Sequence, residues 1–147
     1  KMSKVQAFYH IVFCTKYREM TIPDKVKEDV YRFIWKEITS MKCKLLRIGG
    51  IGNHVHILLE LHPTVALSPL IQSIKAKSSG WLRTDQRFPN FTGGASGYFA
   101  ATISNDVKDQ IINYIKSQPE HHLTSSLDDE FKRLYSWAGL VYDARDL

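Results

Sequence analysis

The sequence predicts an α+β fold, in which a ferredoxin-like antiparallel sheet carries helices on one face and leaves the other face for a site. Three observations predict it. Segments of strand and helix character follow one another in the order β-α-β-β-α-β-α. Two of the strands are separated only by a short connection rich in glycine, as in a hairpin. The length of 147 residues suits one core, so we expect residues 1–147 to form a single domain.

The first half of the chain supplies three of the expected strands. Residues 5–15 are rich in β-branched and aromatic side chains, which favours a strand. Apolar residues at helical spacing predict a helix over 24–41, with Pro23 near its first turn. A short strand is expected over 44–48 and another over 54–61. Between them, Gly49-Gly50 and Gly52-Asn53 predict a tight connection.

The second half alternates helix and strand. Ser68 and Pro69 are a suitable cap and first residue for a helix over 68–83. Residues 85–97 have the composition of a loop, and 97–104 that of a fourth strand. A helix is expected from Ser104 or Asn105 to about residue 120, and a last one over 127–137.

The composition is that of an ordinary globular protein with a modest basic excess. The net charge of +5 weakly favours a polyanionic partner such as nucleic acid. No apolar run approaches the ~20 residues that span a bilayer, so we expect no membrane partner. Cys14 and Cys43 are expected to be reduced, as in a cytoplasmic prokaryotic protein. Lys1 before Met2 resembles the remnant of an expression tag.

The most informative segment is Asn53-His54-Val55-His56. Side chains alternate along a strand, so both imidazoles point to one face and Val55 to the apolar face. Their Cα atoms would lie roughly 7 Å apart, a spacing at which two imidazoles can bind one ion. For an isolated His-x-His, two polar residues on a wetted sheet face is the more frequent interpretation.

A later helix offers a chemical complement to this pair. Tyr114 and Gln118 are four residues apart and therefore lie on one helical stripe. A tyrosine has a pKa near 10 and is a poor nucleophile at neutral pH unless it or its target is activated. A divalent cation held by two imidazoles and an amide oxygen would activate a phosphodiester, and this donor set suits Mn²⁺ or Mg²⁺. A tyrosine in an amphipathic helix is, however, far more often a packing residue.

The chain resembles the single-tyrosine HUH transposases, the TnpA-type enzymes of small insertion sequences. Several segments carry the resemblance in order, namely residues 9–18, Asn53 to Leu58, 73–79, 97–100 and Tyr114 to Gln118, followed by His121-His122. The resemblance implies cleavage and rejoining of single-stranded DNA at hairpin-marked element ends. It implies a 5′-phosphotyrosine on Tyr114 and a metal ion on His54, His56 and Gln118. It also implies homodimers, often with active sites shared between subunits. Asn53 departs from the Asp that is common in the family.

Cationic and aromatic residues are candidates for contacts with single-stranded DNA, where they hold phosphates and stack on bases. They lie at the end of the first strand, on the second long helix and in the loop after it, namely Lys16, Tyr17, Arg18, Lys75, Lys77, Arg83 and Arg87.

Three other functions account for parts of this pattern. A domesticated REP-associated tyrosine transposase would share most of these motifs. A non-catalytic ferredoxin-like nucleic-acid binder would leave the combination of His54, His56, Tyr114 and Gln118 unexplained. A two-histidine phosphoesterase requires a second His-x-Thr/Ser motif, whereas His10 is followed by Ile11 and Val12.

Overall fold

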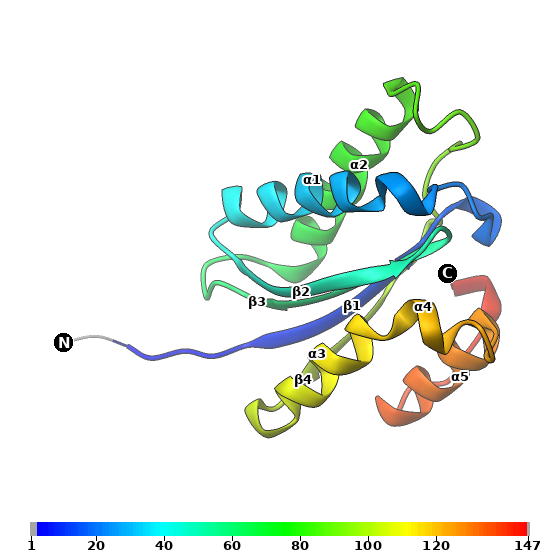
Figure 1. Ribbon diagram of the computed structural model, residues 1–147. Helices are drawn as coiled ribbons and strands as arrows, with labels where there is room; N and C mark the ends of the chain where they lie inside the picture. Colours follow the sequence, from blue (N-terminus) through cyan, green and yellow to red (C-terminus); the bar gives the residue numbers. More distant parts are fainter. Residues whose placement is uncertain (1–2, 147) are drawn as a thin grey trace.

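The computed structural model describes residues 3–146 and consists of a four-stranded antiparallel sheet between two helical layers (Figure 1). Lys1 and Met2 lie outside the described residues. The strand order is β2-β3-β1-β4, which confirms the predicted ferredoxin-like topology. The strands are β1 (Phe8–Cys14), β2 (Lys44–Ile51), β3 (His54–Glu60) and β4 (Phe99–Ile103).

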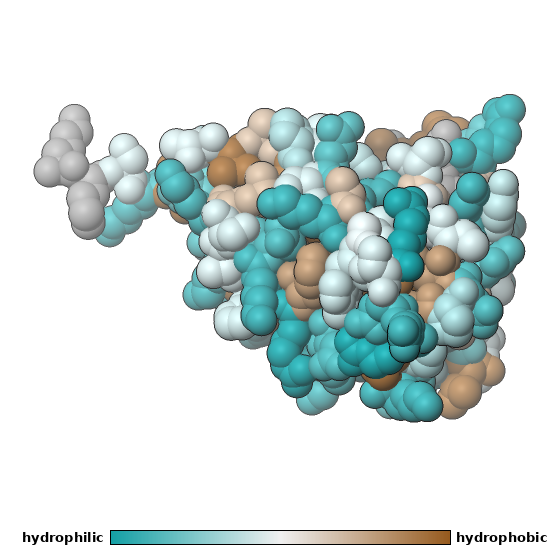
Figure 2. Space-filling view, turned by 90° about the horizontal axis from the view of Figure 1, so that it is seen from above, coloured by the Kyte–Doolittle hydropathy of each residue, from teal (hydrophilic) through white to brown (hydrophobic). Residues whose placement is uncertain are grey.

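One helical layer covers the apolar face of the sheet. It consists of α1 (Lys27–Ser40), preceded by a 3₁₀ turn, and α2 (Leu67–Thr84). Ile11, Val55, Ile57 and Leu59 pack against these helices in the main core. The outer surface of this layer is mainly hydrophilic, with small separate hydrophobic patches (Figure 2). The sequence expectation that Ser68 caps α2 is wrong, because the helix begins at Leu67 after Ala66 and no side chain caps it.

The second layer lies on the opposite face, beneath the sheet in Figure 1. The expectation that this face stays free for ligands is therefore not met. Its helices are α3 (Lys108–Lys116), α4 (Gln118–His121) and α5 (Leu127–Trp137). Ile115 and Phe131, both fully buried, anchor this layer to the sheet.

The helix expected from 105 to 120 is broken at Ser117. A 3₁₀ turn precedes α3, and a second helix restarts at Gln118 with Pro119 in its first turn. A proline has no N–H to donate to the preceding turn and crowds its carbonyls, so it fits a new first turn better than a helix interior. The break directs Gln118 inward, where it is fully buried.

The β2–β3 hairpin is longer than predicted. Gly49 and Gly50 belong to β2 rather than to the turn, and only Gly52-Asn53 connects the strands. Gly49 pairs with His56 in the register of this hairpin. A Cβ atom at Gly49 would lie 2.8 Å from the carbonyl oxygen of Ile115, so α3 approaches β2 more closely than a side chain would permit. This contact sets the distance between α3 and the sheet.

Candidate active site

His54 and His56 point from β3 into the second helical layer, as the strand alternation predicts. Both are buried, whereas Val55 between them belongs to the core on the opposite side. Asn53 Oδ1 lies 2.8 Å from His54 Nδ1, so the residue that departs from the family pattern still bonds the first histidine. That bond leaves the Nε2 atom of His54 directed toward α4 and α5.

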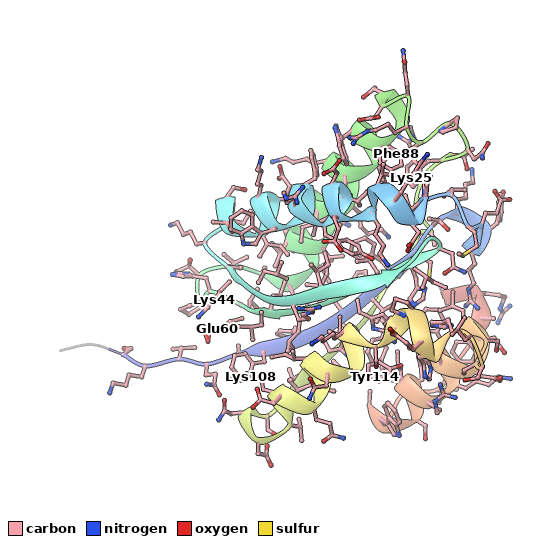
Figure 3. The ribbon with its side chains drawn as sticks, viewed as in Figure 1. Lys25, Lys44, Glu60, Phe88, Lys108 and Tyr114 are labelled. Atoms are coloured by element: carbon pink, nitrogen blue, oxygen red, sulfur yellow. The ribbon has the colours of Figure 1, made fainter. Side chains whose placement is uncertain are left out.

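Gln118 and Tyr114 meet the histidines within the same chain. Gln118 Oε1 lies 2.9 Å from His54 Nε2. The ring centroids of Tyr114 and His56 are 5.6 Å apart, edge to face. Tyr114 projects from α3 in the lower layer (Figure 3). The four residues that the sequence pattern proposed for metal binding and catalysis thus lie together.

The centre of this cluster is Glu130 of α5, which the sequence analysis did not single out. Its Oε1 lies 3.2 Å from His54 Nε2 and 3.3 Å from His56 Nε2. Its Oε2 accepts hydrogen bonds from the Tyr114 hydroxyl and from the Gln118 amide, the latter at 2.6 Å. Glu130 is fully buried. One carboxylate therefore joins both halves of the candidate site.

A third histidine, His122, also contacts the Glu130 carboxylate. His122 Nε2 lies 3.0 Å from Glu130 Oε1 and 3.1 Å from Gln118 Oε1, while its Nδ1 lies 2.9 Å from the Ser125 carbonyl oxygen. His121 is on the periphery, where Arg133 donates to its Nε2 at 2.8 Å.

The residues present fit a divalent metal ion. The ligand atoms of His54, His122 and Glu130 all lie within 4.8 Å of one another. His56 and Gln118 contact the same carboxylate, which extends the donor set to imidazole nitrogens and oxygens from carboxylate and amide. Such mixed donors suit Mn²⁺ and related ions better than Mg²⁺, which prefers oxygen.

His10 of β1 contacts His56 on the side of its ring that faces away from Glu130. His10 Nε2 lies 2.9 Å from His56 Nδ1, and both rings are buried. A bond to the rear nitrogen of a histidine fixes its ring and decides which nitrogen faces the site. The sequence places His10 on the face of β1 that carries the site, but it does not show that His10 pairs with His56.

The electrostatics of the cluster favour the ionised form of the Glu130 carboxyl and the neutral forms of His10 and His56. Burial opposes ionisation of Glu130, but hydrogen bonds from His122, His54 and His56 outweigh it and hold the pKa of this carboxyl well below its usual range. Burial lowers the pKa of His56 to about 4 and that of His10 to about 3. Burial, together with the Glu130 charge, raises the pKa of Tyr114.

These shifts predict that the metal-free protein is acid-labile. The unfolded chain protonates His10 and His56 near pH 6.5, whereas the folded chain does so only near pH 3 and 4. The unfolded state therefore binds more protons within this window, and stability falls as the pH falls through it. We expect a loss of about 1.4 kcal/mol per pH unit for each histidine. Urea unfolding at pH 8, 7, 6 and 5 with a chelator present measures this, and an unchanged stability from pH 8 to 5 would contradict it.

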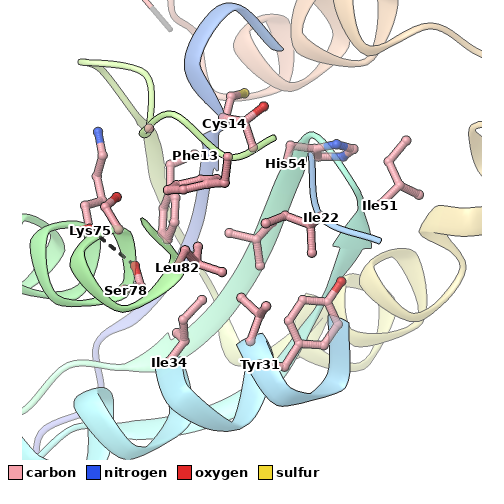
Figure 4. Close-up of a pocket in the computed structure, with 16 residues that line it drawn as sticks. Phe13, Cys14, Ile22, Tyr31, Ile34, Ile51, His54, Lys75, Ser78 and Leu82 are labelled. Atoms are coloured by element: carbon pink, nitrogen blue, oxygen red, sulfur yellow. Dashed lines mark hydrogen bonds between the residues drawn. The ribbon is translucent and has the colours of Figure 1, made fainter. Parts of the chain in front are cut away.

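A small apolar cavity lies on the other side of His54, between the sheet and α1 and α2 (Figure 4). Its volume is about 60 Å³, and Phe13, Ile22 and Leu82 are among its lining residues. This space admits a few water molecules but no nucleotide. The cavity belongs to the core.

Several predicted DNA contacts are already engaged within the chain. Arg18 donates to the Tyr142 hydroxyl at 3.0 Å and lies over the Phe131 ring, so it ties the first loop to α5. Lys75 donates to the carbonyl oxygens of Ala95 and Gly97. Ion pairs join Lys77 to Glu37 and Arg87 to Asp29 and Asp85.

Lys16 and Tyr17 remain the most available of the predicted DNA contacts. Tyr17 is 79% exposed and adopts a left-handed conformation with φ of 59°. Lys16 is exposed as well and lies over the Tyr17 ring. Arg83 runs close to Gly93, at the base of the loop that follows α2.

Comparison with known proteins identifies the family of the chain. Residues 3–118 match the family model described as "Transposase IS200 like". The transposase for insertion sequence element IS200 of Salmonella typhimurium is 29% identical over 119 residues, with 76% of each chain covered. The ISDra2 transposase TnpA of Deinococcus radiodurans is 26% identical over 119 residues, which covers 77% of this chain and 84% of the relative.

Solved structures show the same fold. A crystal structure of a candidate transposase from Deinococcus radiodurans has a TM-score of 0.60 and 22% identity, covering 80% of this chain and 95% of that one. The structure of a REP-associated tyrosine transposase bound to a REP hairpin has a TM-score of 0.63 and 12% identity, covering 83% and 72%. No helix among the described residues is long and apolar enough to cross a membrane. With the family match extending over residues 3–118, the chain belongs to the IS200-like transposases, a family of DNA-processing enzymes.

Proposed function

We propose that this protein cleaves and rejoins single-stranded DNA at the hairpin-marked ends of an insertion sequence, through a 5′-phosphotyrosine on Tyr114. The observation that carries the proposal is the convergence of Tyr114, Gln118, His54 and His56 on the Glu130 carboxylate. A packing tyrosine would not require this set of buried polar partners.

His54, His56 and Gln118 would hold a divalent cation, with Glu130 and His122 as further available ligands. When bound, Mn²⁺ or Mg²⁺ supplies Lewis-acid polarisation of the phosphodiester and neutralises developing charge. His10 fixes the ring of His56, and Asn53 fixes that of His54. These contacts hold the imidazoles in place before a ligand arrives.

Tyr114 would attack phosphorus through its hydroxyl oxygen. The new bond joins this oxygen to the 5′ phosphate, while the bond from phosphorus to the 3′ oxygen breaks. The proton that the tyrosine loses balances the one that the departing 3′ hydroxyl gains. Because the covalent product conserves the energy of the phosphodiester, the reverse step rejoins strands without a nucleotide cofactor. Glu130 orients the hydroxyl and acts as a positioning residue.

The proposed partners are single-stranded hairpin DNA and a second copy of the chain. Lys16 and Tyr17 are proposed to contact the DNA, because both are exposed on a loop next to the site-bearing hairpin.

Removal of the Tyr114 hydroxyl tests the proposal. The wild-type protein, Mn²⁺ and single-stranded hairpin DNA from the flank of its own gene are expected to give a covalent adduct on a denaturing gel. Tyr114→Phe is expected to abolish the adduct while still shifting the DNA on a native gel. Tyr9→Phe is the matched control, since Tyr9 packs in the core on the opposite side. An adduct that persists in Tyr114→Phe overturns the assignment.

A further inference from the structure

A second cleft opens beside Tyr114, between the edge strand β4 and the helices α3 and α5. It has a volume of about 400 Å³. Thr102 of β4 and Gln110 of α3 lie on its walls, together with Tyr114, and Trp137 of α5 closes one side. The proposed nucleophile therefore borders both the polar cluster around Glu130 and this cleft.

The lining of this cleft combines apolar and polar surface in the manner of a site for a flat heterocycle. Phe99 and Leu134 form a buried apolar floor, whereas Thr102 and Gln110 are exposed and carry hydrogen-bonding groups. Small-molecule pockets typically have volumes of about 300–1,000 Å³ and pair apolar walls with a few polar groups. A nucleobase, which has two apolar faces and a polar edge, matches such a lining.

Trp137 is the most informative residue of the cleft. Its side chain is 65% exposed although it ends an amphipathic helix whose other large apolar residues are buried. The centroid of its ring lies 6.2 Å from that of Tyr114 at an interplanar angle of 75°. An exposed indole at this distance from the nucleophile offers a free face on which a base can stack.

We propose that this cleft binds the nucleobase next to the scissile phosphate, with Trp137 as its stacking face. The inference rests on the proposed function, because a phosphate at the Tyr114 hydroxyl brings the flanking bases to the tyrosine by covalent connection. A base held there keeps the phosphodiester in line with the attacking oxygen. Stacking would hold any base, while Thr102 and Gln110 offer contacts to the base edge.

The test uses hairpin DNA whose cleavage position has been mapped from the wild-type adduct. Trp137→Ala is expected to slow adduct formation roughly 10-fold or more, as the loss of one stacked base predicts. Trp137→Phe is expected to restore most of the rate. Trp35→Ala is the matched control, since Trp35 is an exposed tryptophan on α1 of the other layer. Trp137 is exposed, so its replacement leaves the core intact.

Two further measurements separate stacking from a merely structural role. An abasic site next to the scissile phosphate is expected to make the wild type and Trp137→Ala equally slow. A 2-aminopurine at that position is expected to lose fluorescence on binding to Tyr114→Phe, and to keep it when Trp137→Ala is added. Equal rates on intact DNA, or a defect that persists on abasic DNA, overturn the nucleobase pocket. Absence of any wild-type adduct would instead count against the proposed function.

Discussion

Glu130→Ala is expected to lower the free energy of unfolding of the metal-free protein by about 3 kcal/mol or more. The substitution removes the acceptor of the Tyr114 hydroxyl, the Gln118 amide and the His56 imidazole. Each unsatisfied buried polar group costs about 1–3 kcal/mol. Urea unfolding at pH 7.5 in the presence of a chelator measures the loss.

Glu120→Ala provides the control for Glu130. Glu120 is an exposed glutamate on α4, so its removal is expected to change the stability by less than about 0.5 kcal/mol. If both substitutions had the same small effect, the carboxylate of Glu130 would not be the structural centre of the site.

Gly49→Ala is expected to slow adduct formation about 100-fold without preventing folding. Its Cβ would lie 2.8 Å from the Ile115 carbonyl oxygen, so α3 has to move away from β2 and carry Tyr114 with it. Displacement of a reacting group by about 1 Å can cost a factor of 10². The measurement is the rate of covalent adduct formation at saturating DNA, with circular dichroism to confirm the fold.

Gly80→Ala is the matched control for this substitution. A Cβ at Gly80 meets nothing within 4 Å, and the residue lies inside α2 on the opposite layer. An alanine there is expected to leave the adduct rate unchanged and to stabilise the helix by about 0.5–1 kcal/mol. Equal adduct rates for Gly49→Ala and the wild type would show that α3 tolerates the extra methyl group.

The strand that carries the histidines was predictable because its signal is local. The alternation of polar and apolar residues from His54 to Ile57 identifies the strand and also the face to which each side chain points. The stripe of Tyr114 and Gln118 was predictable in part. Its break at Ser117, which turns Gln118 inward, depends on Pro119 and on packing against the sheet.

Glu130 could not be predicted because its burial depends on partners more than 70 residues away, such as His54. The one local signal is that Glu130 lies among Leu127, Phe131 and Leu134 on the apolar stripe of α5. The DNA contacts could not be predicted for a similar reason. A sequence does not show which basic side chains form ion pairs within the fold, and Arg87 is paired with two carboxylates.

The contribution of α5 to the site has a consequence for when the protein becomes competent. Ribosomes release Tyr114 and Gln118 before Glu130, and domains generally fold as units during synthesis. A nascent chain in which α5 has not docked has the histidines of β3 and the tyrosine, but no Glu130 carboxylate between them. The proposed site is therefore complete only after α5 has docked, which is later in synthesis than the appearance of the histidines of β3 and of Tyr114.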